Sequence, residues 1–311
     1  MAFDYDGRWV ELAVATRGDV DGLYNPRRTL LDPILVDAAV EAGADVRHGV
    51  SLVGLTRDGR GRVDGVVIKD GETTRSIGAR FVVGADGVRS RVAAETGAAV
   101  IRQESVTIAT VYAYFEGLRD DRIENYYRDG KVVGTIPTND GATLVWAGIP
   151  SHRFDDVARH DVAEFHASQI DGVPAMRAAM QNAGRVSGFR TFPGLPGFLR
   201  KPWGEGWLLV GDAAYFKDPV SAHGITAALI SAELAANAVA GALDGGDERA
   251  ALAHMQDLRD AMALEMMPPV AVAAALPADM DELMGAFVGI SEAMRAEWAL
   301  IESEFGVLAP A

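Results

Sequence analysis

One stretch of the chain combines residue types and spacing that suit the binding of a ligand. The apolar residues 207–210 predict a strand that ends at Gly211-Asp212; a short loop with Pro219 follows, and Gly224 opens a long Ala-rich helix. Gly211 lets the backbone approach a ligand closely, and Asp212 places a carboxylate where a sugar hydroxyl can donate to it. The N–H groups at the helix start favour a group with partial negative charge. The segment therefore predicts a cofactor site, although an ordinary buried strand, turn and helix would give the same order.

A second short strand is predicted to end in a similar way. The apolar residues 81–83 lead into Gly84, and Asp86-Gly87 and Ser90 follow. Serine is a favoured residue at the start of a helix, because its hydroxyl accepts a hydrogen bond from a free backbone N–H. The segment is either a second ligand-binding loop or a strand, a turn and a capped helix.

A pair of arginines precedes the first predicted helix. Asp32-Pro33 is a suitable N-cap and first helical residue, so we expect a helix over 33–42. Arg27 and Arg28 would then lie just before this helix, either facing a ligand or solvated. The apolar stripe of the predicted helix consists of Leu35, Val36, Ala39 and Val40.

These three segments, in this order, resemble the aromatic hydroxylase-type (class A) flavoprotein monooxygenases, which bind FAD. The resemblance implies that Asp212 binds the ribityl chain and that the helix start at Gly224 faces the N1/O2 edge of the flavin. It also implies that Arg28, or alternatively Arg27, lies against the flavin and that Asp86 lies near the pyrophosphate. The residues that the resemblance assigns to FAD are Arg28, Val46, Asp86, Asp212, Pro219, Gly224 and Ile225.

The resemblance further implies NAD(P)H as the electron donor. In this family the Asp-Gly-x-x-Ser loop helps to build the site shared by FAD and the nicotinamide, and an Arg usually stands three residues past the Ser. Here that position is Ala93, and the nearest arginine is Arg91. This departure bears on nicotinamide binding rather than on FAD.

The fold class implied by the resemblance is α/β: an FAD-binding three-layer nucleotide-binding fold, N-terminally incomplete, interleaved with an antiparallel-sheet substrate domain. The similarity covers roughly residues 20–265, but the chain lacks the strand, Gly-x-Gly-x-x-Gly turn and helix that hold the pyrophosphate in such enzymes. The Gly-rich run at 59–65 has different spacing and predicts a hairpin turn. We therefore expect this chain to bind FAD more weakly than an intact protein. The expected divisions are 1–27 (substrate-domain hairpin), 28–97 (FAD-binding part), 98–192 (sheet-rich substrate domain), 193–245 (FAD-binding part) and 246–311 (C-terminal helices).

The activity implied by the resemblance is NAD(P)H-dependent hydroxylation of a small aromatic or apolar substrate through a flavin hydroperoxide. The cofactor carries that chemistry and the protein supplies positioning and electrostatics, so we name no catalytic acid or base. Two alternatives remain open. One is a flavin-dependent reductase of isoprenoid double bonds, and the other is a truncated, non-enzymatic remnant or binding module that cannot hold FAD.

The composition limits the class of protein. With 311 residues, 49% of them hydrophobic, the chain is long and apolar enough to form a substantial core. Its net charge of −15 argues against nonspecific nucleic-acid binding, which requires clustered Lys and Arg. The chain has no cysteine, which excludes disulfides, thiolate metal sites and Fe–S clusters. No secretory signal or transmembrane segment is evident, so we expect a cytoplasmic protein that acts on a small molecule; its oligomeric state stays open.

Periodicity and turn residues predict the remaining elements. Turns at Asp129-Gly130 and Asp140-Gly141 separate strand-like segments within a block over 106–149, which is typical of an antiparallel meander. The other predicted elements are a hairpin turning at Asp6-Gly7, strands at 45–54 and 185–192, a Pro- and Gly-rich loop at 193–206, and helices at 224–243, 247–267 and 279–300, with Pro268-Pro269 and Pro277 separating the last two.

The histidines predict no metal site. His160 and His166 are six residues apart, so they do not share a helix face well, and together with His152 and Asp161 they favour a surface helix. His223 directly precedes Gly224, where it could contact a flavin or substrate. Packing or hydrogen bonding within the protein is the favoured role of His223.

Aromatic residues of the strand-rich block either line a substrate pocket or pack within the sheet. The block also contains Trp146-Ala147-Gly148-Ile149-Pro150, which is faintly similar to the Trp-x-Trp-x-Ile-Pro signature of flavin-dependent halogenases. Leu144 occupies the first Trp position, so we reject the assignment as a halogenase. The aromatic candidates are Tyr112, Tyr114, Phe115, Tyr126 and Tyr127.

Overall fold

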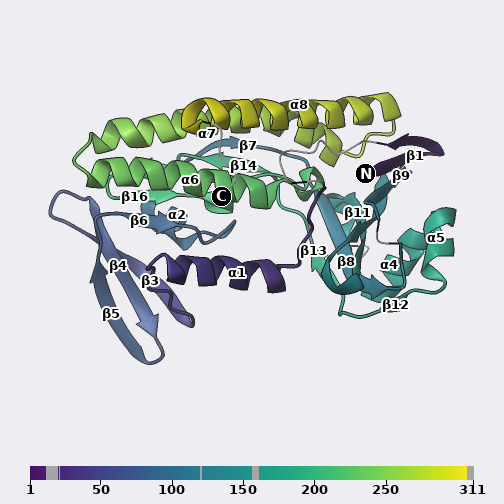
Figure 1. Cartoon of the computed structure of the whole chain (residues 1–311), viewed down its shortest axis with the longest axis horizontal. Helices are drawn as coiled ribbons and strands as arrows, with labels where there is room; N and C mark the ends of the chain where they lie inside the picture. Colours follow the sequence, from purple (N-terminus) through teal and green to yellow (C-terminus); the bar gives the residue numbers. More distant parts are fainter. Residues whose placement is uncertain (12–19, 21, 120, 156–160, 307–311) are drawn as a thin grey trace.

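The computed structural model describes residues 1–11, 20, 22–119, 121–155 and 161–306. Figure 1 shows a large sheet at one end of the molecule, several small sheets at the other, and long helices that run above the small sheets. Helix α8 (Met280–Phe305) extends from the helical layer across to the large sheet. The architecture is mixed α/β, as the sequence predicts.

The large sheet has eight strands in the order β12-β8-β11-β10-β9-β1-β2, with β13 also pairing with β8. The predicted meander and the hairpin at Asp6-Gly7 are confirmed, and β1 joins this sheet by pairing in parallel with β9. The predicted strand over 185–192 is instead two short strands that both pair with β8. The strands are β1 (Ala2–Tyr5), β2 (Arg8–Glu11), β8 (Ile108–Glu116), β9 (Glu124–Arg128), β10 (Lys131–Pro137), β11 (Thr143–Pro150), β12 (Gly184–Arg185) and β13 (Arg190–Phe192).

Each face of the large sheet packs on a different set of helices, because successive side chains of a strand alternate between faces. Phe3, Tyr127 and Val132 form a core cluster with residues of α7 (Glu248–Ala274) and α8. The opposite face packs on α4 (Val162–Asp171) and α5 (Pro174–Met180), where Tyr126 is buried. The sheet is therefore covered on both sides.

The two short strands singled out in the sequence pair with each other. Strand β6 (Val82–Gly84) runs parallel to β16 (Trp207–Leu209), and the N–H of Val210 donates to the carbonyl of Gly84 across 3.0 Å. Parallel neighbours end at the same edge of a sheet. The segments that follow, Asp86-Gly87 and Gly211-Asp212, therefore start from one edge.

The remaining strands form three-stranded sheets around this pair. The sheet orders are β15-β16-β6, β17-β14-β7 and β3-β4-β5. The strands are β3 (Val50–Arg57), β4 (Val63–Asp70), β5 (Thr73–Gly78), β7 (Val100–Gln103), β14 (Phe198–Arg200), β15 (Trp203–Gly204) and β17 (Tyr215–Phe216).

Two predictions about these strands were wrong. Residues 44–49 are not part of a strand, and β3 starts only at Val50. Val50 pairs with Asp70, which is the last residue of the partner strand β4, so no partner is left for the residues before Val50. The Pro- and Gly-rich segment 193–206 contains β14 and β15 rather than only loop. Strand β14 forms because it pairs with β7 and β17, and such distant partners are invisible in a local sequence pattern.

Helix α1 (Arg28–Glu41) starts one turn earlier than predicted, with Pro33 inside it. A proline near the start of a helix removes only one early hydrogen bond, and Arg28 forms an ion pair with Asp32 on the next turn. No residue of α1 is buried, so its apolar stripe faces outward or toward a hollow.

The three long helices at the C-terminal end pack on one another. Helix α6 (Gly224–Leu243) has the predicted bounds, but α7 (Glu248–Ala274) continues through Pro268-Pro269, where a break was predicted. The buried side chains of Met266, Met267 and Val270 hold this part of α7 in the core, which outweighs the lost hydrogen bonds. By length and composition alone, helix α6 could cross a membrane. Core helices of globular proteins meet the same two criteria.

The turn between β15 and β16 yields a prediction about stability. Gly206 has φ +78°, and a Cβ there would lie 1.9 Å from the carbonyl oxygen of Val63. We expect Gly206→Ala to lower the free energy of unfolding by more than about 2 kcal/mol, since it adds a backbone clash to the strain of a positive φ. The control is Gly61→Ala, because Gly61 has φ +90° but open space around its Cβ position. Equal losses in urea denaturation for both variants would contradict the role of the clash.

Candidate functional site

The loop after β16 is held in a conformation that requires glycine. Gly211 has φ +54°, and its N–H donates to Ser231 Oγ of α6 across 2.8 Å. A Cβ at Gly211 would also approach Cβ of Ala228 to 3.3 Å. The loop therefore lies close against α6, and it fixes where the next residue, Asp212, projects.

Asp212 is a partly buried carboxylate with charged neighbours. Burial raises its pKa, while the nearby cations Lys217 and Arg28 lower it. Arg28 comes from the start of α1, far away in sequence, so the structure brings together two of the residues predicted to contact a cofactor. No hydrogen bond to Asp212 is found within the described part of the chain. Its oxygens are therefore free to accept from a ligand hydroxyl.

The start of α6 is an uncapped helix N-terminus. The side chain of His223, at the N-cap, makes no capping hydrogen bond, and the first backbone bond of the helix runs from Ala227 to the carbonyl of His223. Apart from its chain neighbours and its own helix backbone, a Cβ added at Gly224 would meet no atom of the described residues within 4 Å, and Ile225 is exposed. The N–H groups of Gly224 and Ile225 are therefore available to a partly negative group.

The loop that carries Pro219 is anchored to the large sheet by Asp218, a residue that the sequence analysis did not single out. One carboxylate oxygen of Asp218 accepts from Thr107 Oγ1 (2.7 Å) and from the N–H of Ile108 (2.9 Å). The other accepts from the N–H of Val220 across 2.9 Å. Asp218 thus links the loop that follows Asp212 to the large sheet.

A buried cluster of ionisable groups lies behind this loop, and of its members only His223 was considered from the sequence. Burial lowers the pKa of Lys217 to about 8 and that of His223 to about 4. His223 Nε2 lies 3.5 Å from Glu297 Oε1, and burial raises the pKa of Glu297. At neutral pH His223 is therefore uncharged, as expected for a packed histidine.

Lys217 gives a prediction with a defined pH range. Its folded pKa of about 8 lies below the ordinary 10.5, so burying the ammonium opposes folding fully below pH 8 and not at all above about pH 10.5. We expect Lys217→Met to raise the free energy of unfolding at pH 7 by on the order of 3 kcal/mol, with the gain shrinking as the pH rises between those values. Denaturation of both proteins across pH 7–10 measures it. A gain that stays constant over this range would contradict the buried-ammonium interpretation.

Asp86 and Val46 are placed differently from Asp212. Asp86 accepts from the N–H groups of Arg91 (2.6 Å) and Val92 (3.2 Å), and Ser90 accepts from Ala93 N, so both side chains cap α2 (Arg91–Thr96). The predicted cap at Ser90 is confirmed. Val46 is 38% exposed in the irregular segment after α1.

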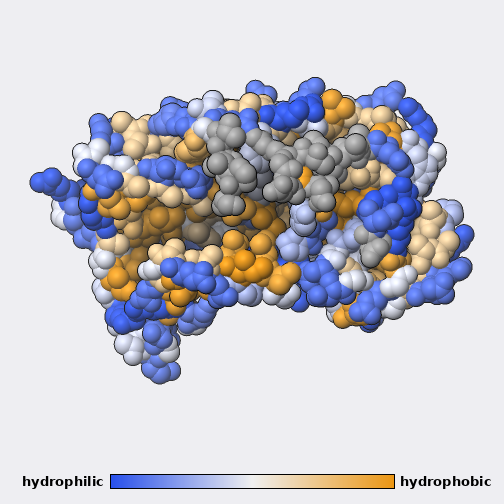
Figure 2. Space-filling view, viewed as in Figure 1, coloured by the Kyte–Doolittle hydropathy of each residue, from blue (hydrophilic) through white to orange (hydrophobic). Residues whose placement is uncertain are grey.

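An apolar hollow lies between α1 and α6 in the space-filling view (Figure 2). The elements around it carry large hydrophobic side chains that are exposed. They are Leu30, Ile34, Leu35 and Val40 of α1, Val83 of β6, and Ile225 and Leu229 of α6.

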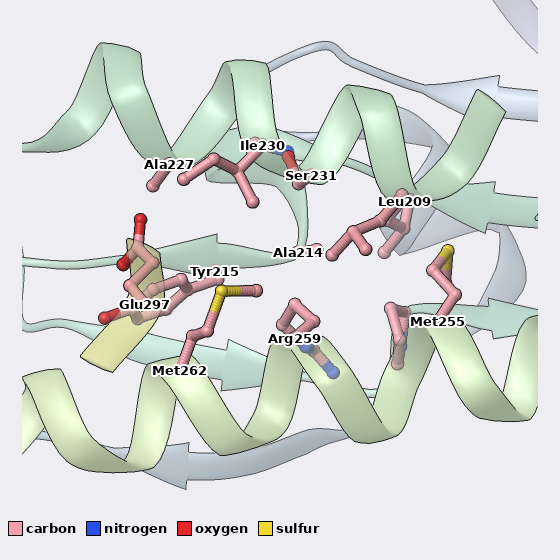
Figure 3. Close-up of a pocket in the computed structure, with 13 residues that line it drawn as sticks. Leu209, Ala214, Tyr215, Ala227, Ile230, Ser231, Met255, Arg259, Met262 and Glu297 are labelled. Atoms are coloured by element: carbon pink, nitrogen blue, oxygen red, sulfur yellow. The ribbon is translucent and has the colours of Figure 1, made fainter. Parts of the chain in front are cut away.

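Two cavities flank the loop over residues 211–222. One, of about 30 Å³, lies under it between α6 and α7, with Glu297 and Tyr215 at one end and Ile230 and Met262 along its sides (Figure 3). This cavity is too small for a flavin ring. The other, of about 350 Å³, lies between the large sheet and α8, and residues 219–222 form part of its wall.

The larger cavity decides between the alternatives for the aromatic residues. Tyr112 and Tyr127 line it, whereas Tyr126 and Phe115 pack on the opposite face of the sheet. His166 is buried there too, and its Nε2 donates to the carbonyl of Val145 across 3.1 Å, so this side chain faces inward from the predicted surface helix. His160 lies outside the described residues. Among those described, no group of side chains could hold a metal ion.

Comparison with known proteins identifies the family. Residues 23–268 match the FAD binding domain family (FAD_binding_3), and the chain belongs to it. A digeranylgeranylglycerophospholipid reductase of Methanocella arvoryzae is 26% identical over 251 residues, which cover 79% of this chain and 61% of the relative. The chain thus spans about three-fifths of the length of this relative.

Solved structures show the same fold at lower identity. The myxobacterial chondrochloren halogenase CndH superimposes with a TM-score of 0.74 at 23% identity, over 94% of this chain and 73% of that one. PqsL of Pseudomonas aeruginosa, in complex with 2-aminobenzoylacetate, gives a TM-score of 0.67 at 21% identity, over 84% and 72%. The departure at Leu144 therefore does not separate this chain from the fold of halogenases.

The residues around Asp212 fit part of an FAD molecule. An unpaired carboxylate suits a ribityl hydroxyl, and the uncapped start of α6, with open space at Gly224, suits the edge of a flavin ring. The capping bonds made by Asp86 leave it less suited to a direct contact. The described residues thus suit the flavin end of the cofactor.

Proposed function

We propose that this chain forms the flavin and substrate side of an NAD(P)H-dependent FAD monooxygenase that hydroxylates a small aromatic or apolar molecule. The observation that carries the proposal is the loop over residues 218–224. Its first part lines the apolar cavity of about 350 Å³, and its end is the uncapped helix start at Gly224. A flavin edge and a small apolar substrate would therefore be neighbours.

The residues of the chain have separable roles in this proposal. Asp212 holds the ribityl chain, the N–H groups of Gly224 and Ile225 bind the flavin edge, and Arg28 balances the charge of Asp212. Asp218 keeps the loop in place against the sheet. The apolar cavity wall excludes water from the substrate. FAD, when bound, would carry electrons from NAD(P)H to O2.

A reductase acting on isoprenoid double bonds is the second candidate, supported by the similarity to the Methanocella arvoryzae enzyme. Both candidates use the same flavin site, and they differ in whether O2 is consumed. A third outcome, a binding module that cannot hold FAD, would leave the exposed apolar residues around the hollow as a surface for another role.

The test is to titrate the purified chain with FAD and then to supply NADH or NADPH. We expect the yellow absorbance of bound FAD, and O2 consumption that rises when small aromatic compounds are added. Reduction of an isoprenoid substrate without O2 consumption would favour the reductase. No uptake of FAD at any concentration would overturn the proposal.

A further inference from the structure

Lys217 is a buried cation to which the proposed function gives no role. It directly follows β17, and only 6% of its surface is exposed. Within the described residues no hydrogen bond or ion pair of its ammonium group is found. Its Nζ lies 4.6 Å from the centre of the Tyr215 ring, whose face attracts a cation. The ammonium is therefore held by packing and by the charges around it, not by a direct partner.

The charges around Lys217 come from several elements. Burial lowers the pKa of Lys217 to about 8, although the carboxylates of Glu297 on α8 and Asp212 after β16 act against this effect. The ammonium in turn adds to the effect of burial in lowering the pKa of His223 at the start of α6. The titratable and charged groups near Lys217 are Asp212, Tyr215, Asp218, His223 and Glu297, with Glu104 across a cavity of about 10 Å³ that α7 also lines, and Arg259 of α7 acting on Tyr215.

The loop places this cation between the two groups that suit a flavin. Asp212 precedes Lys217 on the loop, and the uncapped helix start at Gly224 follows it. Charges in a protein interior are screened much less than charges in water, so the ammonium acts on a charge that develops at either group. A buried ammonium without a partner weakens the fold, and residues that do so beside a binding site are typical of functional positions.

The flavin ring changes its charge when it is reduced. The oxidised ring is uncharged, and uptake of two electrons and one proton leaves it with one negative charge at the N1/O2 edge. The helix start at Gly224 offers this anion only a partial positive charge. Lys217 adds a full positive charge behind the same loop.

We propose that the ammonium of Lys217 sets the reduction potential of a flavin bound at Asp212 and Gly224, by favouring the anion over the oxidised ring. Lys217 keeps its proton and acts through its charge alone, so it is not a catalytic acid. This inference rests on the flavin site of the proposed function, and it adds the residue that controls how readily the flavin accepts electrons.

The test compares midpoint potentials at saturating FAD for the unmodified chain, Lys217→Met and Lys201→Met. Methionine removes the charge at similar length, and Lys217→Met is expected to strengthen the fold. Lys201 is a matched control because it is exposed and its Nζ also lies over an aromatic ring, 5.4 Å from the centre of Trp203. At pH 7 we expect Lys217→Met to lose about tenfold in affinity for reduced relative to oxidised flavin, a fall in potential of about 30 mV, and Lys201→Met to show no change.

Three further measurements separate an effect of charge from an effect on the shape of the loop. The affinity of Lys217→Met for oxidised FAD should stay within about threefold of the unmodified chain, because the oxidised ring is uncharged. The gap in potential between these two proteins should shrink as the pH rises past the pKa of Lys217, about 8, where the ammonium loses its proton. Lys217→Arg keeps the charge and should keep the potential.

Equal potentials for the unmodified chain and Lys217→Met at pH 7, or an equal fall in Lys201→Met, would overturn the inference. A gap that stays constant from pH 7 to pH 9 would overturn it as well. Circular dichroism checks the fold of every variant, and Lys217→Met still decides the question if Lys217→Arg does not fold. The expected gap in potential without O2 consumption would overturn the proposed monooxygenase and support this inference, whereas a failure to take up FAD would overturn both.

Discussion

Replacing Gly224 with Val is expected to lower the affinity of the chain for FAD and the reduction potential of the bound flavin. The start of α6 is uncapped, and apart from neighbouring backbone of the same helix no atom of the described residues lies within 4 Å of the Cβ position of Gly224. A valine side chain there would occupy the space of the flavin edge and push it away from the N–H groups of Gly224 and Ile225. The dipole and these groups favour the anionic reduced flavin by about 0.3–2 kcal/mol, so moving the ring away lowers the potential.

The control for this variant is Gly241→Val, near the other end of the same helix. A Cβ at Gly241 likewise meets no atom within 4 Å among the described residues outside its own helix backbone, so both variants add the same β-branched side chain to an open position on α6. We expect at least about a tenfold loss of FAD affinity for Gly224→Val and little change for Gly241→Val. Absorbance titration gives the affinities, and a redox titration at saturating FAD gives the midpoint potentials. An unchanged potential with unchanged affinity in Gly224→Val would place the flavin elsewhere.

Local sequence patterns were sufficient to predict those features whose hydrogen bonds and packing are formed within one segment of the chain. The bounds of α6 and the cap at Ser90 follow from Gly, Ser and the apolar runs beside them. The pairing of β6 with β16 could also be expected, because two short apolar strands that each end in glycine and aspartate suit one parallel sheet.

Tertiary contacts decided the features that the sequence could not predict. Helix α7 continues through Pro268-Pro269 because Met266 and Met267 before the prolines and Val270 after them are all buried. The cluster of Lys217, His223 and Glu297 forms only when α8 lies over the loop, and Glu297 carries no local signal.

Removing the carboxylate of Asp212 is expected to weaken FAD binding far more than removing that of Asp86. Asp212 has no hydrogen bond within the described residues and lies beside the two cations Arg28 and Lys217. A direct bond from a ribityl hydroxyl to this carboxylate is worth about 1.5–3 kcal/mol, so Asp212→Ala should lose about 10- to 150-fold in affinity. One oxygen of Asp86, Oδ2, already accepts from the N–H groups of Arg91 and Val92.

The loss in free energy of unfolding should rank the two variants in the opposite order, with the larger loss for Asp86→Ala. Asp86→Ala removes capping bonds from α2 and should lower the free energy of unfolding by about 0.5–2 kcal/mol. Asp212→Ala removes a carboxylate whose pKa is raised by burial, so it should not destabilise the fold. Fluorescence titration with FAD and urea denaturation of both variants measure the two rankings independently. If Asp86→Ala loses as much FAD affinity as Asp212→Ala while keeping its stability, Asp86 contacts the cofactor directly and the roles assigned to the two carboxylates are wrong.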